Sequence, residues 1–187
     1  MRRNSFYHLL YSLLKKIVSI SFNILNLLLG GNLPPLVGVN VIVEENERYL
    51  VLEHSNGKFS FPGGFMRWRE RPAQTALREV KEETGLSLHL KGSLTHYSIT
   101  SRNFLQMSTI TIVYIGELIG GELRSSIEGK PCWRDEAQLR KHSTSNERLI
   151  YLLDEYLRFR AQSAGKVPGG NEHDMSVMTG IPTLNSD

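Results

Sequence analysis

One short stretch, residues 63–86, constrains this chain more than any other. It reads GGFMRWRERPAQTALREVKEETGL and combines a glycine turn with a segment rich in glutamate. Pro72 suits the first turn of a helix, and Gly85 suits the position just past its end. The sequence therefore predicts a helix over residues 72–84, which follows a turn where the backbone can approach a ligand closely.

Several glutamates crowd one face of this predicted helix. At about 100° per residue, Glu79, Glu82 and Glu83 share a face, and like charges three or four residues apart repel each other. Mg²⁺ prefers carboxylate oxygens and keeps water and substrate phosphates as its other ligands. The pattern therefore predicts a divalent-metal site. The alternative is a solvated acidic face balanced by Arg78 and Lys81.

The spacing across this stretch is more specific than its charge. In order, the defined positions are Gly64, Glu70, Arg78, Glu79, Val80, Glu82, Glu83, Gly85 and Leu86. They resemble the signature of the Nudix hydrolase family, G-x5-E-x7-R-E-U-x-E-E-x-G-U with U aliphatic, and every defined position matches. The resemblance implies an α/β fold, the Nudix-type α/β/α sandwich, over residues 36–160.

The resemblance implies a metal site built from the turn and the helix. Glu82 and Glu83 match metal ligands of the family, and Glu79 matches a further ligand or a base that acts on the attacking water. The backbone carbonyl of Gly64 would face the metal. The implied cofactor is Mg²⁺, with Mn²⁺ as an alternative.

The resemblance also implies supporting residues and a reaction. Arg78 would hold the acidic side chains in place through charge-assisted hydrogen bonds. Glu70 would support that network and could bind a second metal. The implied reaction is hydrolysis of a diphosphate linkage in a nucleoside diphosphate derivative, such as a nucleoside triphosphate, a nucleotide sugar or ADP-ribose. The alternative function is a non-catalytic module that senses a nucleotide.

Two features outside the signature bear on the substrate. Some members of the family recruit a further glutamate, for which Glu117, Glu122 and Glu128 are the candidates, and the sequence does not choose between them. Family members that act on ADP-ribose often carry a proline soon after the signature, but none stands between Leu86 and Pro131. The substrate is therefore left open.

The loop before the predicted helix is a candidate substrate-binding segment. Arg67 and Arg69 carry guanidinium groups that suit phosphate oxygens, and Trp68 offers a face for a base or a sugar. Trp133, in PCWRDEAQL, is a further candidate for the wall of a nucleoside pocket. The alternative is a solvated loop, with both tryptophans packed on the protein.

Residues 1–33 form a separate apolar and basic segment. The first 43 residues contain arginines and lysines but no acid. Polar residues recur at intervals of three and four and trace a narrow stripe on a helix: His8, Ser12, Lys15, Ser19, Asn23 and Asn26. We predict an amphipathic helix on the cytoplasmic face of a membrane, with packing on the domain or in a homodimer as alternatives. Its apolar run falls short of the roughly 20 residues that a spanning helix needs.

The rest of the chain reads as strands, one more helix and a tail. Patterning predicts a hairpin turning at 45–47, long strands at 88–100 and 104–118, and a helix over 146–160. Residues 161–187 are rich in Gly, Pro, Ser and Asn and are predicted to be a flexible tail. The packing face expected for helix 72–84 consists of Ala73, Leu77 and Val80.

Composition limits the partners and the compartment. A net charge of +3 is too small by itself to indicate a nucleic-acid binder. The family resemblance implies a nucleotide-derived small molecule as the partner. Cys132 is the single cysteine and cannot form an internal disulfide. We therefore expect a reducing compartment. The intracellular substrates that the resemblance implies lead us to expect a cytoplasmic location.

Overall fold

The computed structural model describes residues 2–142 and 147–165. Within those ranges the chain forms two units. The smaller unit holds residues 2–36 and the connection 98–110, and the larger unit holds the rest. No helix of the described chain is long and apolar enough to cross a membrane.

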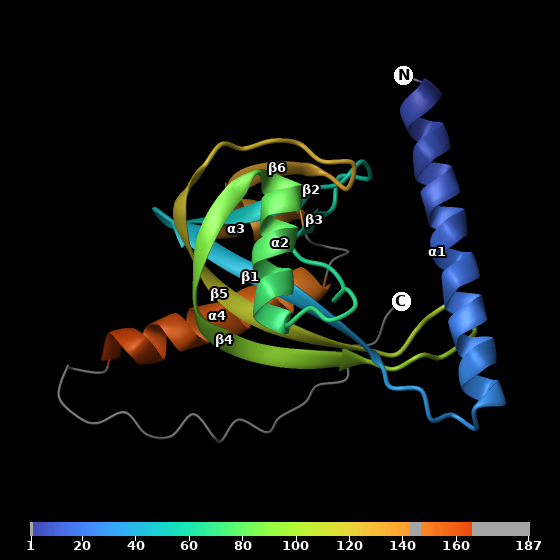
Figure 1. The fold of residues 1–187 in the computed structure, drawn as a ribbon. Coiled ribbons are helices and arrows are strands. Elements are labelled where there is room, and N and C mark those ends of the chain that lie inside the picture. The colour runs from blue at the N-terminus through green and yellow to red at the C-terminus, as the bar shows by residue number, and fades with distance from the viewer. Residues whose placement is uncertain (1, 143–146, 166–187) are drawn as a thin grey trace. The chain divides into compact units, whose positions relative to one another are not determined.

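The larger unit is organised around a six-stranded sheet, coloured from blue to orange along the chain in Figure 1. The strand order is β3-β2-β1-β5-β4, and β6 pairs with β2. The strands are β1 (Leu36–Glu45), β2 (Arg48–Glu53), β3 (Phe59–Ser60), β4 (Leu86–Ile99), β5 (Thr109–Gly121) and β6 (Lys130–Asp135).

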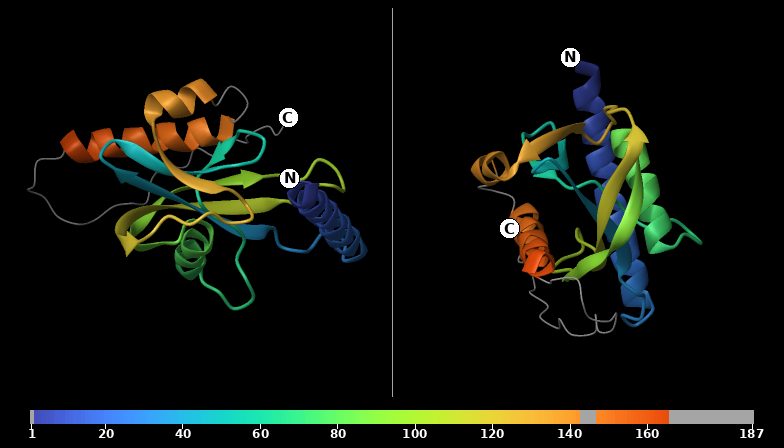
Figure 2. Two further views of the ribbon diagram at one scale, coloured as in Figure 1. Left: turned by 90° about the horizontal axis from the view of Figure 1, so that it is seen from above. Right: turned by 90° about the vertical axis from the view of Figure 1, so that its left-hand side faces the viewer.

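Helices cover both faces of this sheet. Helix α2 (Pro72–Thr84) lies on one face, and α3 (Glu136–His142) and α4 (Glu147–Gly165) lie on the other (Figure 2). On the α4 face, Tyr156 packs edge-on against Tyr49 at a centroid distance of 6.0 Å. The predicted α/β/α sandwich is confirmed.

The core between the sheet and α2 follows from alternation along the strands. Side chains two residues apart on a strand point to the same face. In β1, Val39, Val41 and Val43 are buried in one cluster with Ala76 and Val80 of α2. This cluster anchors α2 on the sheet and so fixes the direction of its glutamates.

The packing face of α2 differs from the predicted one. Val80 is buried as expected, but Ala73 is exposed and Leu77 is 41% exposed. Ala76 and Glu83 are buried instead. The helix is oriented so that Glu83 contacts the glycine turn. The same orientation places Leu77 at the solvent-exposed edge of the helix. An apolar pattern does not reveal this polar contact, so the prediction missed the orientation.

The other predicted elements are largely confirmed. The hairpin turns at Asn46 and Glu47, whose φ angles of 50° and 60° are the left-handed values that a two-residue hairpin loop requires. The second long strand begins at Thr109 rather than at residue 104. Helix α4 continues to Gly165, past the predicted start of the tail. The remaining tail, 166–187, lies outside the described residues.

The smaller unit contains α1 (Arg2–Leu28), the helix predicted from the N-terminal sequence. The side-chain amide of Asn23 donates to the carbonyl oxygens of Phe104, at 3.0 Å, and Gln106, at 2.7 Å. These bonds hold residues 101–108 as a connection between β4 and β5, which explains why the strand predicted from residue 104 starts later.

Candidate active site

The glycine turn at residues 62–64 is fixed against β1. The N–H of Val41 donates to the carbonyl of Pro62 at 2.8 Å, and the N–H of Val39 donates to the carbonyl of Gly64 at 2.9 Å. A Cβ atom on Gly63 would lie 2.0 Å from the carbonyl oxygen of Val39. Glycine is therefore required for the turn to lie this close to the strand.

The same turn lies against the acidic side of α2. A Cβ atom on Gly64 would lie 2.4 Å from Oε1 of Glu79, so the carboxylate sits directly beside this backbone. The carbonyl of Gly64, predicted to face a metal, already accepts the N–H of Val39. A carbonyl oxygen has two lone pairs, so this bond leaves room for a second partner.

Arg78 gathers several of the acidic side chains into one network. Its Nε and Nη2 donate to the two oxygens of Glu70, at 2.6 and 2.8 Å. Its Nη1 donates to Glu79 at 2.7 Å and to Glu82 at 3.2 Å. The guanidinium, followed by the N–H of Arg67, lowers the pKa of Glu70 to about 2. The network ties three carboxylates to one guanidinium, which offsets part of their charge and fixes their directions.

Glu83 lies outside the Arg78 network and is only 4% exposed. The N–H of Gly63 donates to its Oε2 at 2.8 Å, and the carboxyl of Glu128 hydrogen-bonds to it. Burial raises the pKa of Glu83 to about 8; the Gly63 N–H opposes this shift, and the charge of Glu128 adds to it. Among the described residues no lysine or arginine forms an ion pair with Glu83. A buried carboxyl in this setting favours a bound cation.

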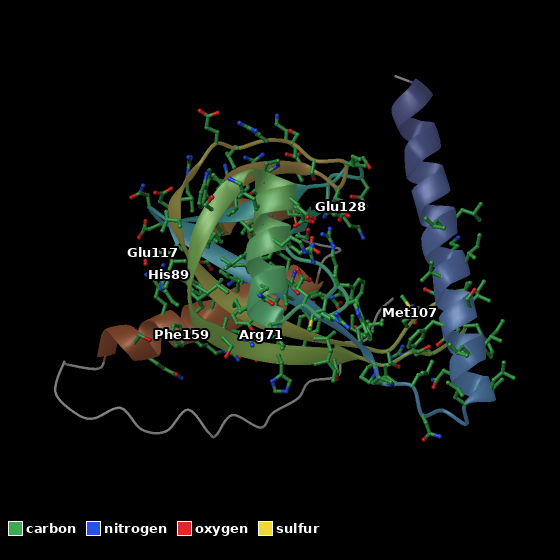
Figure 3. The ribbon with its side chains drawn as sticks, viewed as in Figure 1. Arg71, His89, Met107, Glu117, Glu128 and Phe159 are labelled. Atoms are coloured by element: carbon green, nitrogen blue, oxygen red, sulfur yellow. The ribbon has the colours of Figure 1, made fainter. Side chains whose placement is uncertain are left out.

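The structure distinguishes the three glutamates outside the signature. Glu128 lies beside Glu83, whereas Glu117 pairs with Lys91 at 3.3 Å on the surface. Figure 3 labels Glu117 and Glu128, which lie on opposite sides of α2 in that view. Glu122 is exposed. Of the three, only Glu128 is brought to the acidic cluster.

The loop that carries Glu128 is held by His54, a residue that no sequence pattern marks as functional. Nδ1 of His54 lies 2.8 Å from the backbone oxygen of Glu128, and Nε2 lies 2.7 Å from Oγ of Ser60. A carbonyl oxygen only accepts, so Nδ1 is the donor. No local pattern marks His54, because its partner is far away in the sequence.

The arginine-rich loop is only partly drawn to the cluster. Nη2 of Arg67 donates to Glu82 at 2.9 Å, and its N–H donates to Glu70 at 2.9 Å. Trp68 is 88% exposed, and the guanidinium of Arg69 lies 5.8 Å from its ring centroid. Trp133 of β6 is half-buried and packs on the core cluster. The structure thus brings Arg67 to the acidic side chains. Trp133 packs on the core cluster, as the alternative interpretation expected.

The donor set suits a hard divalent cation, although its ligands are not drawn together as one group. Oxygen atoms of carboxylates and of the turn backbone are the donors that Mg²⁺ prefers. Within residues 2–142 and 147–165, no three His, Cys, Asp or Glu side chains converge as a ready-made metal site. Glu79 and Glu82 bond to Arg78 instead. The ligand set Gly64, Glu79, Glu82 and Glu83 therefore stays a prediction.

The Arg78 network leads to a first prediction. Arg78→Lys is expected to lower the free energy of unfolding by about 1–3 kcal/mol, because an ammonium cannot bond to both oxygens of Glu70 and reach Glu79 as well. Activity should fall about tenfold as the carboxylates lose their fixed directions. Chemical unfolding and steady-state rates measure both effects. The matched control is Arg158→Lys, at an exposed pair with Glu155; equal behaviour of the two variants would remove the role assigned to the network.

Comparison with known proteins supports the family resemblance. The model of the NUDIX domain matches residues 34–155. An ADP-ribose pyrophosphatase from Methanocaldococcus jannaschii is 34% identical over 133 residues, which cover 68% of this chain and 76% of that protein. A MutT-like protein from Streptomyces ambofaciens is 31% identical over 128 residues, which cover 65% and 80%.

Solved structures give the same result for the fold. A NUDIX hydrolase from Nitrosomonas europaea superposes with a TM-score of 0.59 at 20% identity, covering 67% of this chain and 90% of that one. The signature spacing, the sandwich and the family match over more than half of the chain point the same way. The chain therefore belongs to the Nudix hydrolase family and is a pyrophosphohydrolase that cleaves diphosphate linkages.

Proposed function

We propose that this enzyme hydrolyses a nucleoside diphosphate derivative with Mg²⁺ as its cofactor. Nudix hydrolases generally need divalent metal ions. The observation that carries the proposal is the environment of Glu83, a buried carboxyl that bonds to the N–H of Gly63 and to Glu128. A buried carboxyl in contact with a second carboxyl is a favourable place for a hard cation.

Each part of the acidic cluster then has its own task. Glu79, Glu82 and Glu83 would hold the ion, with the carbonyl of Gly64 as a further donor. A divalent ion bound there would neutralise phosphate charge and make water more acidic. Glu128 would accept the proton of the water whose oxygen attacks phosphorus, while the bond to the bridging oxygen breaks and the second phosphate leaves with its substituent.

Arg67 is the arginine that we assign to the substrate phosphates. Its side chain is exposed and reaches Glu82, so it lies beside the proposed metal ligands. A guanidinium can bond to two phosphate oxygens at once. Trp68 is the most exposed aromatic of the loop and offers its face to a base or sugar.

ADP-ribose is the first substrate that we propose to test. The 34% identical relative from Methanocaldococcus jannaschii is named an ADP-ribose pyrophosphatase. Nucleoside triphosphates and nucleotide sugars contain the same diphosphate linkage and are tested beside it. Purified protein with Mg²⁺ should release a phosphorylated product from at least one of them. Tight binding of one compound without turnover of any would favour the nucleotide-sensing module instead.

The role of Arg67 gives a second prediction. Arg67→Ala is expected to raise KM about five- to tenfold and to change kcat by less than about threefold, because a lost phosphate contact weakens ground-state and transition-state binding alike. Steady-state kinetics on the best substrate measure the two constants. Arg158→Ala on α4, which is also exposed, is the control. An unchanged KM for Arg67→Ala would show that this side chain does not bind substrate and belongs to a solvated loop.

A further inference from the structure

We propose that α1 lies on an anionic membrane surface with its exposed apolar side chains in contact with the lipid. The inference concerns the smaller unit alone and does not depend on the catalytic site. It rests on three observations: the polar side chains of α1 form hydrogen bonds within the protein, the apolar side chains are exposed, and the segment is basic.

The polar stripe of α1 is engaged by the protein's own backbone. Asn23 donates to the carbonyl oxygens of Phe104 and Gln106. Oδ1 of Asn26 accepts the N–H of Leu33 at 2.9 Å. Ser19, on the same stripe, is buried. From Ser19 to Asn26 the stripe is therefore the inner side of the helix, the reverse of an amphipathic helix whose apolar stripe faces a protein core. The side chains of His8, Ser12 and Lys15 lie outside the described part.

The apolar side of α1 is exposed along most of the described helix. At about 100° per residue these side chains cover roughly half of the circumference. Phe104 and Leu105, on the connection that Asn23 holds, are also exposed. The exposed apolar side chains of α1 are Leu13, Leu14, Ile17, Val18, Ile24, Leu25, Leu27 and Leu28. Exposed apolar side chains gathered on one side of a helix in this number mark an interaction site.

The charge of the segment favours lipid over a second copy of the chain. Arg2, Arg3, Lys15 and Lys16 are basic, and no acid precedes Glu44. Anionic headgroups attract such a helix, while its apolar side chains enter the acyl boundary. Two copies pairing through α1 would instead bring two basic, acid-free helices together, which like-charge repulsion opposes. The geometry and the charge therefore point to one occupant, an anionic bilayer.

Vesicle flotation of the full-length protein tests the proposal. The protein should float with vesicles of phosphatidylglycerol and phosphatidylcholine at about 0.05 M salt. The bound fraction should fall severalfold at about 0.5 M salt and on phosphatidylcholine alone, because salt screens the headgroup attraction. Absence of flotation with anionic vesicles at low salt would overturn the proposal. Equal binding to both vesicle types would overturn its electrostatic part.

Matched variants distinguish lipid binding by the apolar side of α1 from nonspecific binding through other exposed apolar residues. The triple variant Leu14→Gln, Ile17→Gln and Ile24→Gln should bind at least about tenfold more weakly. The control Ile119→Gln with Ile127→Gln, at exposed positions of the larger unit, should float like the parent. Parental flotation of the triple variant would overturn the assignment.

Two further measurements keep the test decisive. Diphosphate hydrolysis by the triple variant should match the parent, which shows that the fold is kept. If the triple variant fails to fold, Arg2→Glu with Arg3→Glu takes its place, since it alters no apolar group and should abolish the preference for anionic vesicles. A stable dimer that does not float and that the triple variant converts to a monomer would replace lipid by a second copy as the occupant.

Discussion

Glu83→Gln is expected to lower kcat by about two to three orders of magnitude while the fold is kept, because a metal-held phosphate site supplies several kcal/mol of transition-state stabilisation. The amide has the same size as the carboxyl and still offers an oxygen to the N–H of Gly63. It also removes the negative charge that an ionised Glu83 would place beside Glu128. Without metal, the free energy of unfolding of Glu83→Gln should therefore equal that of the parent or be slightly higher.

The measurement joins kinetics with metal-dependent stability. For the parent, Mg²⁺ or Mn²⁺ should raise the melting temperature, since a ligand that binds only the folded state stabilises it. In Glu83→Gln this increase should largely disappear. Glu117→Gln, at the surface pair with Lys91, is the matched control and should keep both activity and metal stabilisation. Parental turnover of Glu83→Gln with unchanged Mg²⁺ dependence would remove Glu83 from the site.

Glu82→Gln should act in the same direction through a different route. Glu82 is half exposed and bonds to Arg67 and Arg78, whereas Glu83 is buried and bonds to backbone. Loss of the Glu82 charge therefore removes a proposed ligand and weakens the ion pairs with Arg67 and Arg78, while Arg78 keeps its bonds to Glu70 and Glu79. The two glutamates are neighbours in the sequence, yet their environments make them unequal.

Local pattern was enough to predict the helix that carries these residues. Pro72 and Gly85 bound α2 as expected, since the first fits a helix start and the second takes a left-handed φ of 79° beyond its end. The hairpin of β1 and β2 follows in the same way from its alternation and its polar turn. Such features depend on neighbours in the chain, so the sequence alone specifies them.

Elements that depend on distant partners were not predictable in this way. β6 includes Pro131 and Asp135, which are poor strand formers, and it exists because it pairs with β2 along its whole length. The choice of Glu128 over Glu117 depends on the same long-range pairing, because His54 of the β2–β3 connection holds the Glu128 loop. The sequence contains several candidate glutamates, and only the sheet brings one of them to Glu83.

The N-terminal helix shows a further feature that sequence periodicity cannot predict. The sequence predicts a polar stripe and a wide apolar side, but periodicity does not say which side faces the protein. In the structure Asn23 and Asn26 bond inward, because the backbone of the β4–β5 connection and of Leu33 offers them partners. The inverted orientation follows from these hydrogen bonds, whose acceptors and donors lie far from the helix in the sequence or beyond its end.

Gly63→Ala is expected to be the most destabilising small change in the site. The new methyl group would lie 2.0 Å from the carbonyl oxygen of Val39 and 2.8 Å from Cα of Asn40, both of them backbone atoms of β1. The turn would have to move off the strand and break the bonds that Val39 and Val41 donate to it. We expect the free energy of unfolding to fall by about 3 kcal/mol or more, with a melting temperature about 10 °C lower.

A control variant at a second glycine distinguishes the effect of this close contact from the effect of backbone strain. Gly92 of β4 has a φ of 158°, against 157° at Gly63, but a Cβ atom there would meet nothing within 4 Å. Gly92→Ala therefore carries the same conformational cost without the clash and should lose only about 1–2 kcal/mol. Activity should fall sharply in Gly63→Ala alone, because moving the turn withdraws the N–H that bonds to Glu83. Equal losses of stability and activity in the two variants would mean that the contact between the turn and β1 does not hold the acidic cluster in place.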